Sequence, residues 1–279
     1  MYMGVDCSAA VYWAWATVST TLQWRYTHDM FPAKDLGCVA VGQWEGADTL
    51  MDSAEVFMAN DEQTMAKAYA QLRKGDAITT YFNNVPTKLS INHARLLAED
   101  PVILINHDGQ IDVDRSYVIW HGQGDGLGSN YQNSSWLIDH KSSLRELFDD
   151  FYLPLSCMEL REGVQPECVV TVDTDGTGKA YLATGMVETN YRLISTTIRI
   201  TDESGAEVFE KTLFTAVDKW INTSTNDYAR TTVNSFDLAA FAVYLGQAQL
   251  EAGKTYTYEL SAVPGTGESH VLKTFTFVQ

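Results

Sequence analysis

The sequence predicts an α+β protein of two domains, and two observations carry that prediction. Helical and strand patterns are mixed up to residue 163, whereas residues 167–279 carry short runs of alternating apolar and polar residues separated by Gly, Asp, Ser and Pro. Several such runs in succession are typical of antiparallel strands in a β-sandwich. We therefore expect a mixed domain over 1–163 and an Ig-like or fibronectin-like sandwich over 167–279, joined by GVQPE.

The composition provides material for a hydrophobic core and narrows the range of partners. The chain has 279 residues, of which 45% are apolar, and a formal charge of −17. No cluster of Lys and Arg interrupts this acidic balance, which argues against nucleic acid as a partner. Residues 8–22 are weakly polar but contain Ser, Thr and Gln and lack a basic flank, so we expect no membrane insertion and no signal peptide there.

The four cysteines show no metal-binding pattern. Cys7, Cys38, Cys157 and Cys168 form no CxxC pair and have no zinc-like spacing with His, so we expect neither a metal nor another cofactor. Cys157 and Cys168 are close enough in sequence to pair in an oxidising compartment, but free thiols are the simpler interpretation.

Three elements of the first half follow from local patterns. Residues 61–73 predict a helix, because Asp61 can cap its start and Gly75 follows its end. The next run, AITTYF at 77–82, predicts a strand. Residues 144–153, LRELFDDFYL, predict a short closing helix.

Two longer runs predict the arms of an antiparallel hairpin. They are INHARLLAEDPVILI at 91–105 and SYVIWHGQ at 116–123, with Asp108 and Gly109 near the tip between them. The hairpin determines which residues of the second arm can lie beside His93 of the first.

The stretch GVDCSAAVYWAW predicts a helix that starts near Cys7. A thiol in the first turn lies at the positive end of the helix, which favours the thiolate that attacks carbonyl carbon. The alternative is a small, inert core cysteine. His93 begins a strand that could face this helix end, and a Cys with an adjacent His is what a thiol nucleophile and its base require.

Three short blocks then carry a resemblance to a known family. DCSAAV preceded by YMG, then KGDAI, then NHARLL resemble successive blocks of the NlpC/P60 family, papain-like cysteine peptidases of bacterial cell walls, over about residues 2–125. The resemblance implies a helix packed on an antiparallel sheet, cleavage of peptidoglycan stem peptides without a cofactor, and a secreted or cell-wall location. Ala9 departs from the family's usual glycine, and Ala94-Arg95 departs from its usual valine–glycine.

Further site residues come from the resemblance and from strand geometry. By resemblance, Tyr2, Asp6 and Ser8 fall where family members contact the free amine of a stem peptide. Arg95 shares a strand face with His93, so its guanidinium could hold a substrate carboxylate, or it could form a structural ion pair.

The family's third catalytic position is a polar residue on the next strand that orients the histidine. Asn106 is excluded if the strand is continuous, because 13 residues at about 3.3 Å each place it roughly 40 Å from His93. His121 and Gln123 lie on the returning arm, opposite residues 93–95, and share one face. We prefer His121, whose ring can exchange a hydrogen bond with His93, and Gln123 is the alternative.

The expected chemistry is acyl transfer to the Cys7 sulfur with His93 as base, in a cysteine peptidase acting on peptidoglycan or a short peptide. Two other functions stay open: a non-catalytic cell-wall or adhesion binding protein on the same fold, and a transglutaminase-like acyltransferase using Asp108. The second half contains no Cys/His/Asp cluster. We therefore expect it to bind or position a partner that the sequence does not identify.

Overall fold

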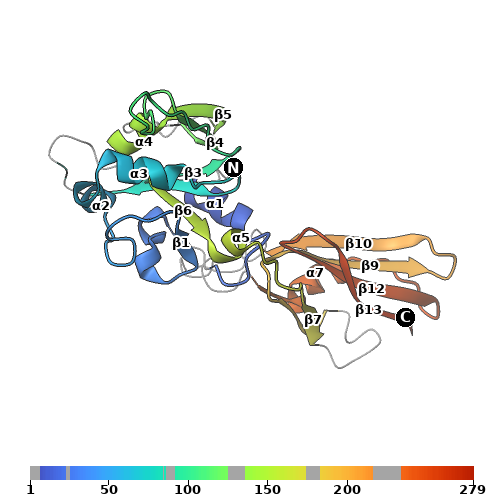
Figure 1. Ribbon diagram of the computed structural model, residues 1–279. Coiled ribbons are helices and arrows are strands. Elements are labelled where there is room, and N and C mark those ends of the chain that lie inside the picture. The colour runs from blue at the N-terminus through green and yellow to red at the C-terminus, as the bar shows by residue number, and fades with distance from the viewer. Residues whose placement is uncertain are drawn as a thin grey trace. The chain divides into compact units, whose positions relative to one another are not determined.

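The computed structural model describes most of the chain and divides it into two compact units (Figure 1). The described residues are 7–22, 26–83, 85, 92–124, 136–173, 183–215 and 234–279. The first unit contains the chain up to Trp15 together with Thr21–Gln165, and the second contains Ala16–Thr20 together with Pro166–Gln279. The main boundary therefore falls within GVQPE. Helices and mostly antiparallel sheets make the protein α+β, as predicted.

The first unit is built on one antiparallel sheet of six strands. In spatial order these are β1 (Cys38–Ala40), β6 (Leu153–Cys157), β2 (Ala77–Tyr81), β3 (Asn92–Leu97), β4 (Tyr117–Gln123) and β5 (Trp136–Ser143). Strand β6 is buried along its whole length and β2 is buried except at Tyr81, whereas β5 is largely exposed. The core therefore lies over the middle of the sheet, and β2 confirms the predicted strand at 77–82.

In the described part of the first unit, five α-helices accompany this sheet, with two 3₁₀ helices between the first helix and β1. They are α1 (Cys7–Trp15), η1 (Thr27–Asp29), η2 (Pro32–Lys34), α2 (Ser53–Ala59), α3 (Glu62–Tyr69), α4 (Leu144–Asp149) and α5 (Met158–Glu162). The predicted cap of α3 is confirmed, because the Asp61 carboxylate accepts a hydrogen bond from the Thr64 N–H at 2.7 Å.

Two predicted helices end earlier than the sequence pattern indicates. After α3 the chain turns toward β2, where the Asp76 carboxylate accepts a hydrogen bond from the Arg73 N–H at 2.8 Å and Gly75 adopts a φ of +90°. After α4, Phe151 adopts a φ of +59°, and Leu153 already begins β6. In both places the turn into a buried strand limits the length of the helix.

The predicted hairpin is confirmed in its pairing but not in the continuity of its arms. The Cα partners are Leu96 with His121 and Leu97 with Trp120 in the ladder, and Val102 with Tyr117 and Ile105 with Ile111 as isolated bridges. At the tip, the Asn106 side chain accepts hydrogen bonds from the N–H groups of Asp108 and Gln110, both at 3.0 Å. The tip therefore lies at Asp108 and Gly109, as predicted.

The second unit consists of two antiparallel sheets that share one core. One sheet has the order β10 (Glu207–Phe214), β9 (Leu193–Asp202), β12 (Thr255–Pro264), β13 (His270–Val278), and the other β11 (Ser235–Asp237), β8 (Met186–Thr189), β7 (Val170–Asp173). Buried residues from both sheets, such as Val187, Ile198 and Tyr258, pack in a single cluster. Two short helices, η6 (Leu238–Phe241) and α7 (Ala242–Leu245), follow β11. The sandwich is therefore present, and its Ig-like or fibronectin-like topology stays a prediction.

Candidate functional site

Cys7 is the first residue of α1, and α1 packs against β3 and β4. Val11 and Trp15, on the stripe that begins at Cys7, are buried at 1% exposure each, while Cys7 itself is half-buried. The predicted helix is therefore present, with its apolar side buried and the thiol in its first turn.

The far end of α1 fixes its position along β3. The Trp15 indole N–H donates to the Gly75 carbonyl at 2.7 Å, and the Gly75 N–H donates to the Leu97 carbonyl at 3.0 Å. The rise of α1 from Cys7 to Trp15 is about 12 Å. The length of β3 from His93 to Leu97 is about 13 Å. Trp15 is thus linked through Gly75 to Leu97, and α1 is about as long as β3 from His93 to Leu97.

A second set of contacts places the thiol at the same end of β3. The Cys7 sulfur lies 3.8 Å from the Thr27 hydroxyl, and the ring centroid of His28, the next residue, lies 5.6 Å from that of Tyr81. Tyr81 is the Cα partner of Asn92, the first residue of β3. The start of α1 and the start of β3 are therefore at one end of the sheet.

His93 is buried, and β4 holds its ring. The Nε2 atom lies 2.6 Å from the main-chain oxygen of Gln123. Because a carbonyl oxygen can only accept, Nε2 carries the proton in this hydrogen bond. The neutral ring therefore has its basic lone pair on Nδ1, the tautomer that a base acting through Nδ1 requires.

The structure does not bring the His121 side chain to His93. His121 is the Cα partner of Leu96, so strand alternation places its side chain on the face opposite that of His93. Its Nδ1 atom instead accepts a hydrogen bond from the Asp139 N–H at 3.2 Å. Gln123 contacts the imidazole through its main-chain carbonyl rather than its amide. The group that contacts the imidazole at this distance is thus a backbone atom, which side-chain patterns could not reveal.

Arg95 packs between aromatic rings instead of facing an open cleft. Its guanidinium carbon lies 3.9 Å from the centroid of the Trp120 ring and 4.6 Å from that of Tyr152, and the residue is 4% exposed. A Cβ at Gly122 would come within 3.2 Å of the Arg95 Cγ, so glycine leaves room for this side chain. Arg95 therefore makes cation–π contacts with these two rings, and its contact with a substrate carboxylate stays a prediction.

The other predicted binding residues are only partly described. Ser8 is buried at 3% exposure, so its side chain is not on the surface of the described structure. Tyr2 and Asp6 lie outside the described residues. Asp108, which a transglutaminase-like site would use, is 64% exposed at the hairpin tip, where it contacts the His107 ring at 3.3 Å.

The four cysteines are unbonded in this structure and differ in burial. Burial raises the pKa of Cys38 to about 12 and that of Cys157 to about 11. Cys7 and Cys168 are half-buried, and the Cys168 sulfur accepts a hydrogen bond from the Thr266 hydroxyl at 3.8 Å. Cys168 is therefore the matched comparison for Cys7 in any test of thiol reactivity.

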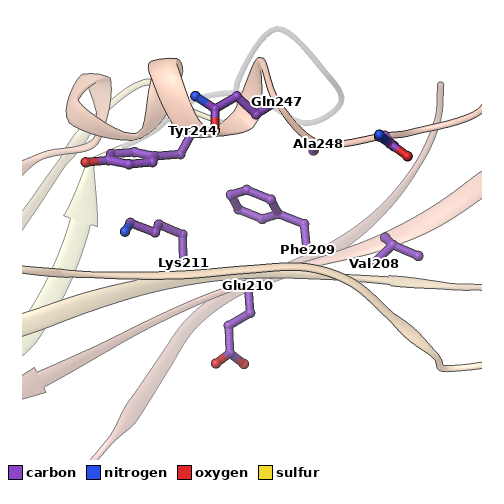
Figure 2. A pocket seen from close by; sticks show the side chains of 8 residues that line it. Val208, Phe209, Glu210, Lys211, Tyr244, Gln247 and Ala248 are labelled. Atoms are coloured by element: carbon purple, nitrogen blue, oxygen red, sulfur yellow. The ribbon is translucent and has the colours of Figure 1, made fainter.

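A groove of about 580 Å³ lies in the second unit, where sequence reasoning identified no site (Figure 2). Its walls come from edge strand β10 and from the segment that contains α7: Val208, Phe209, Glu210, Lys211, Tyr244, Gln247, Ala248 and Gln249. Figure 2 shows Phe209 and Lys211 pointing toward the α7 side and Glu210 pointing away. The Lys211 ammonium lies 4.3 Å from the centroid of the Tyr244 ring.

Neither a metal centre nor a membrane span was found in the described part of the chain. Within those ranges no three His, Cys, Asp or Glu side chains are grouped so that they could hold a metal ion. The described helices are also too short or too polar to cross a bilayer.

Comparisons with known proteins do not place the chain in a family. No protein-family model and no curated protein matches the sequence. Among solved structures, two of the β-glucuronidase from Parabacteroides merdae, one with glycerol in its active site, are 15% identical with a TM-score of 0.19. Each match covers 45% of this chain and 15% of the glucuronidase, so it spans a small part of that enzyme.

Proposed function

We propose that the first unit is a cysteine peptidase of the NlpC/P60 kind that hydrolyses amide bonds in peptidoglycan stem peptides. Two observations support the proposal: the start of α1, with Cys7, and the start of β3, with His93, lie at one end of the sheet, and the Gln123 carbonyl oxygen lies 2.6 Å from Nε2 of the His93 ring. The substrate class, and a secreted or cell-wall location in a bacterium, rest on the resemblance of DCSAAV, KGDAI and NHARLL to that family.

In the proposed reaction, His93 Nδ1 takes the thiol proton, and the Cys7 sulfur attacks the carbonyl carbon of the scissile amide. The main-chain N–H groups at the start of α1 stabilise the negative charge that develops on the carbonyl oxygen. The leaving amine takes the proton from His93, and a thioester results. His93 then removes a proton from water, which attacks the thioester and releases the carboxylic acid and the thiol.

The Gln123 carbonyl has a defined role in these reaction steps. When Nδ1 gains a proton, the ring becomes positive, and the Nε2–H···O hydrogen bond strengthens because its donor is charged. The same bond prevents the ring from turning away between proton transfers. The Gln123 carbonyl thus orients the His93 ring and stabilises its positive charge, as a side-chain acceptor does in other Cys–His sites.

Hydrolysis of defined muropeptides by the full chain tests the proposal. The wild-type protein should release a new amine and a new carboxylate, Cys7→Ser and His93→Ala should each lose at least a thousandfold in kcat/KM, and Cys168→Ser should be unchanged. Binding of muropeptides without turnover would favour the non-catalytic alternative. Transfer of the acyl group to an added amine, in preference to water, would favour a transglutaminase-like enzyme.

For the second unit we propose binding or positioning of the cell-wall substrate, with the groove between β10 and α7 as the contact surface. An aromatic ring, an ammonium group and side-chain amides line it together, so it can pair apolar and hydrogen-bonding contacts with one ligand. Sedimentation of the full chain with purified peptidoglycan should weaken at least fivefold in Phe209→Ala/Tyr244→Ala. Unchanged sedimentation of a folded double variant would remove the groove from this role.

A further inference from the structure

Two of the free thiols face each other across the edge of the six-stranded sheet. Among the described strands, β1 lies at the edge of the sheet and pairs with β6 alone, and Cys38 is the direct Cα partner of Cys157. The same register pairs Val39 with Ser156 and Ala40 with Leu155. Directly paired residues point to the same face of a sheet, so the two thiols lie side by side.

A hydrogen bond at the other end of β1 shows which type of cross-strand pair Cys38 and Cys157 form. The Val41 N–H donates to the Pro154 carbonyl at 3.0 Å, so these two residues occupy a hydrogen-bonded position of the register. Hydrogen-bonded and non-hydrogen-bonded pairs alternate along an antiparallel ladder. Three steps further along, Cys38 and Cys157 therefore form a non-hydrogen-bonded pair.

A non-hydrogen-bonded pair has the spacing that a disulfide needs. Its Cα atoms are about 4.5 Å apart and its side chains are the closer of the two types. Disulfides span Cα separations of about 4.4–6.8 Å, so the bond requires rotation of the two side chains and little movement of the backbone. Burial raises the pKa of Cys38, and the charge of the neighbouring Cys157 thiolate raises it further.

We propose that Cys38 and Cys157 form a disulfide that fastens β1 to the sheet when the chain folds in an oxidising compartment. The two thiols lose two protons and two electrons, the S–S bond forms, and a disulfide oxidant such as oxidised glutathione is reduced to two thiols. Cys38 is 7% exposed and Cys157 is fully buried, so an oxidant reaches them before β1 closes. The bond therefore forms during folding, and reductant acts slowly on the folded protein. This proposal does not depend on the peptidase activity.

Refolding the full chain provides the test. The reduced, unfolded protein is refolded with oxidised and reduced glutathione or with a phosphine reductant, the remaining thiols are alkylated, and non-reduced peptides are mapped by mass spectrometry. We expect a Cys38–Cys157 peptide only after oxidative refolding, with Cys7 and Cys168 alkylated. We also expect a midpoint of thermal unfolding several degrees above that of the reduced protein.

Two control variants distinguish a Cys38–Cys157 disulfide from other cysteine pairings. Cys168→Ala should leave the cross-linked peptide unchanged, whereas Cys38→Ala should abolish it and leave Cys157 alkylated under denaturing conditions. If Cys38→Ala does not fold, the peptide map of the wild-type protein decides by itself. A map that shows Cys157 bound to Cys168, or four alkylated cysteines after oxidative refolding, would overturn the proposal.

Discussion

Trp15→Phe tests the contact that aligns α1 with β3. The substitution keeps an aromatic ring but removes the indole N–H, which donates to the Gly75 carbonyl at 2.7 Å in a position where Trp15 is 1% exposed. Leaving this partly buried carbonyl without its donor costs about 1–3 kcal/mol. The smaller ring leaves a cavity that adds roughly 1 kcal/mol. The free energy of unfolding of the first unit should therefore fall by about 2–4 kcal/mol.

The assay is urea unfolding of the full chain, followed by tryptophan fluorescence and far-UV circular dichroism. A loss of this size should lower the unfolding temperature of a domain of 150–250 residues by roughly 4–16 °C. Trp136→Phe is the matched control, because Trp136 is 45% exposed on β5 and its replacement should change the free energy by less than about 0.5 kcal/mol. Equal effects of the two substitutions would refute the assignment of Trp15 as the residue that fixes α1.

Three further predictions concern other contacts of the first unit. Arg95→Ala should lower the free energy of unfolding by about 2–4 kcal/mol, because it leaves a cavity and removes two cation–π contacts. It should not raise the KM of the protein that stays folded. A raised KM with unchanged stability in urea would instead place Arg95 in the substrate site. His121→Ala should keep the kcat/KM of the wild type, measured on muropeptides, whereas loss comparable to His93→Ala would restore His121 as the orienting residue. Under reducing conditions, stability should fall as pH rises above about 9, since unfolded thiols ionise there while burial raises the pKa of Cys38 to about 12 and of Cys157 to about 11. The free energy of unfolding, measured from urea midpoints, should fall by roughly 1.4 kcal/mol per pH unit for each thiol. Cys38→Ala should remove the part of this pH dependence that comes from Cys38. The same pH dependence in wild type and variant would contradict the argument that burial raises the pKa of Cys38.

Features set by neighbouring residues were predictable from the sequence. The Asp61 cap, the strand at 77–82 and the hairpin tip at Asp108 depend on interactions within a few residues, and the structure contains all three. The ends of α3 and α4 were overestimated, because the chain turns toward β2 and β6 before it reaches the predicted ends at residues 73 and 153. Burial of those strands competes with helix extension and prevails.

For the candidate site, the sequence indicated residue types but not the contacts that these residues make. His93 was identified from its place at a strand start, yet its partner is a main-chain oxygen, which every residue has and no pattern singles out. Arg95 was assigned by strand alternation alone, and the rings of Trp120 and Tyr152 come from segments distant in sequence. Cys38 lies opposite Cys157 only because β1 and β6 pair, whereas spacing had indicated Cys168 as the nearer partner.

The alkylation rate of Cys7 tests the central claim most directly, because it reports the thiol and its base without requiring the substrate to be known. The wild-type protein and His93→Ala are treated with iodoacetamide at pH 6, and each cysteine is quantified by mass spectrometry over time. If Cys7 is a nucleophile served by His93, it should react faster than the equally half-buried Cys168 and far faster than Cys38 and Cys157, and its rate should fall at least tenfold in His93→Ala. A Cys7 that reacts no faster than Cys168, or whose rate is the same with and without the imidazole, would contradict the account.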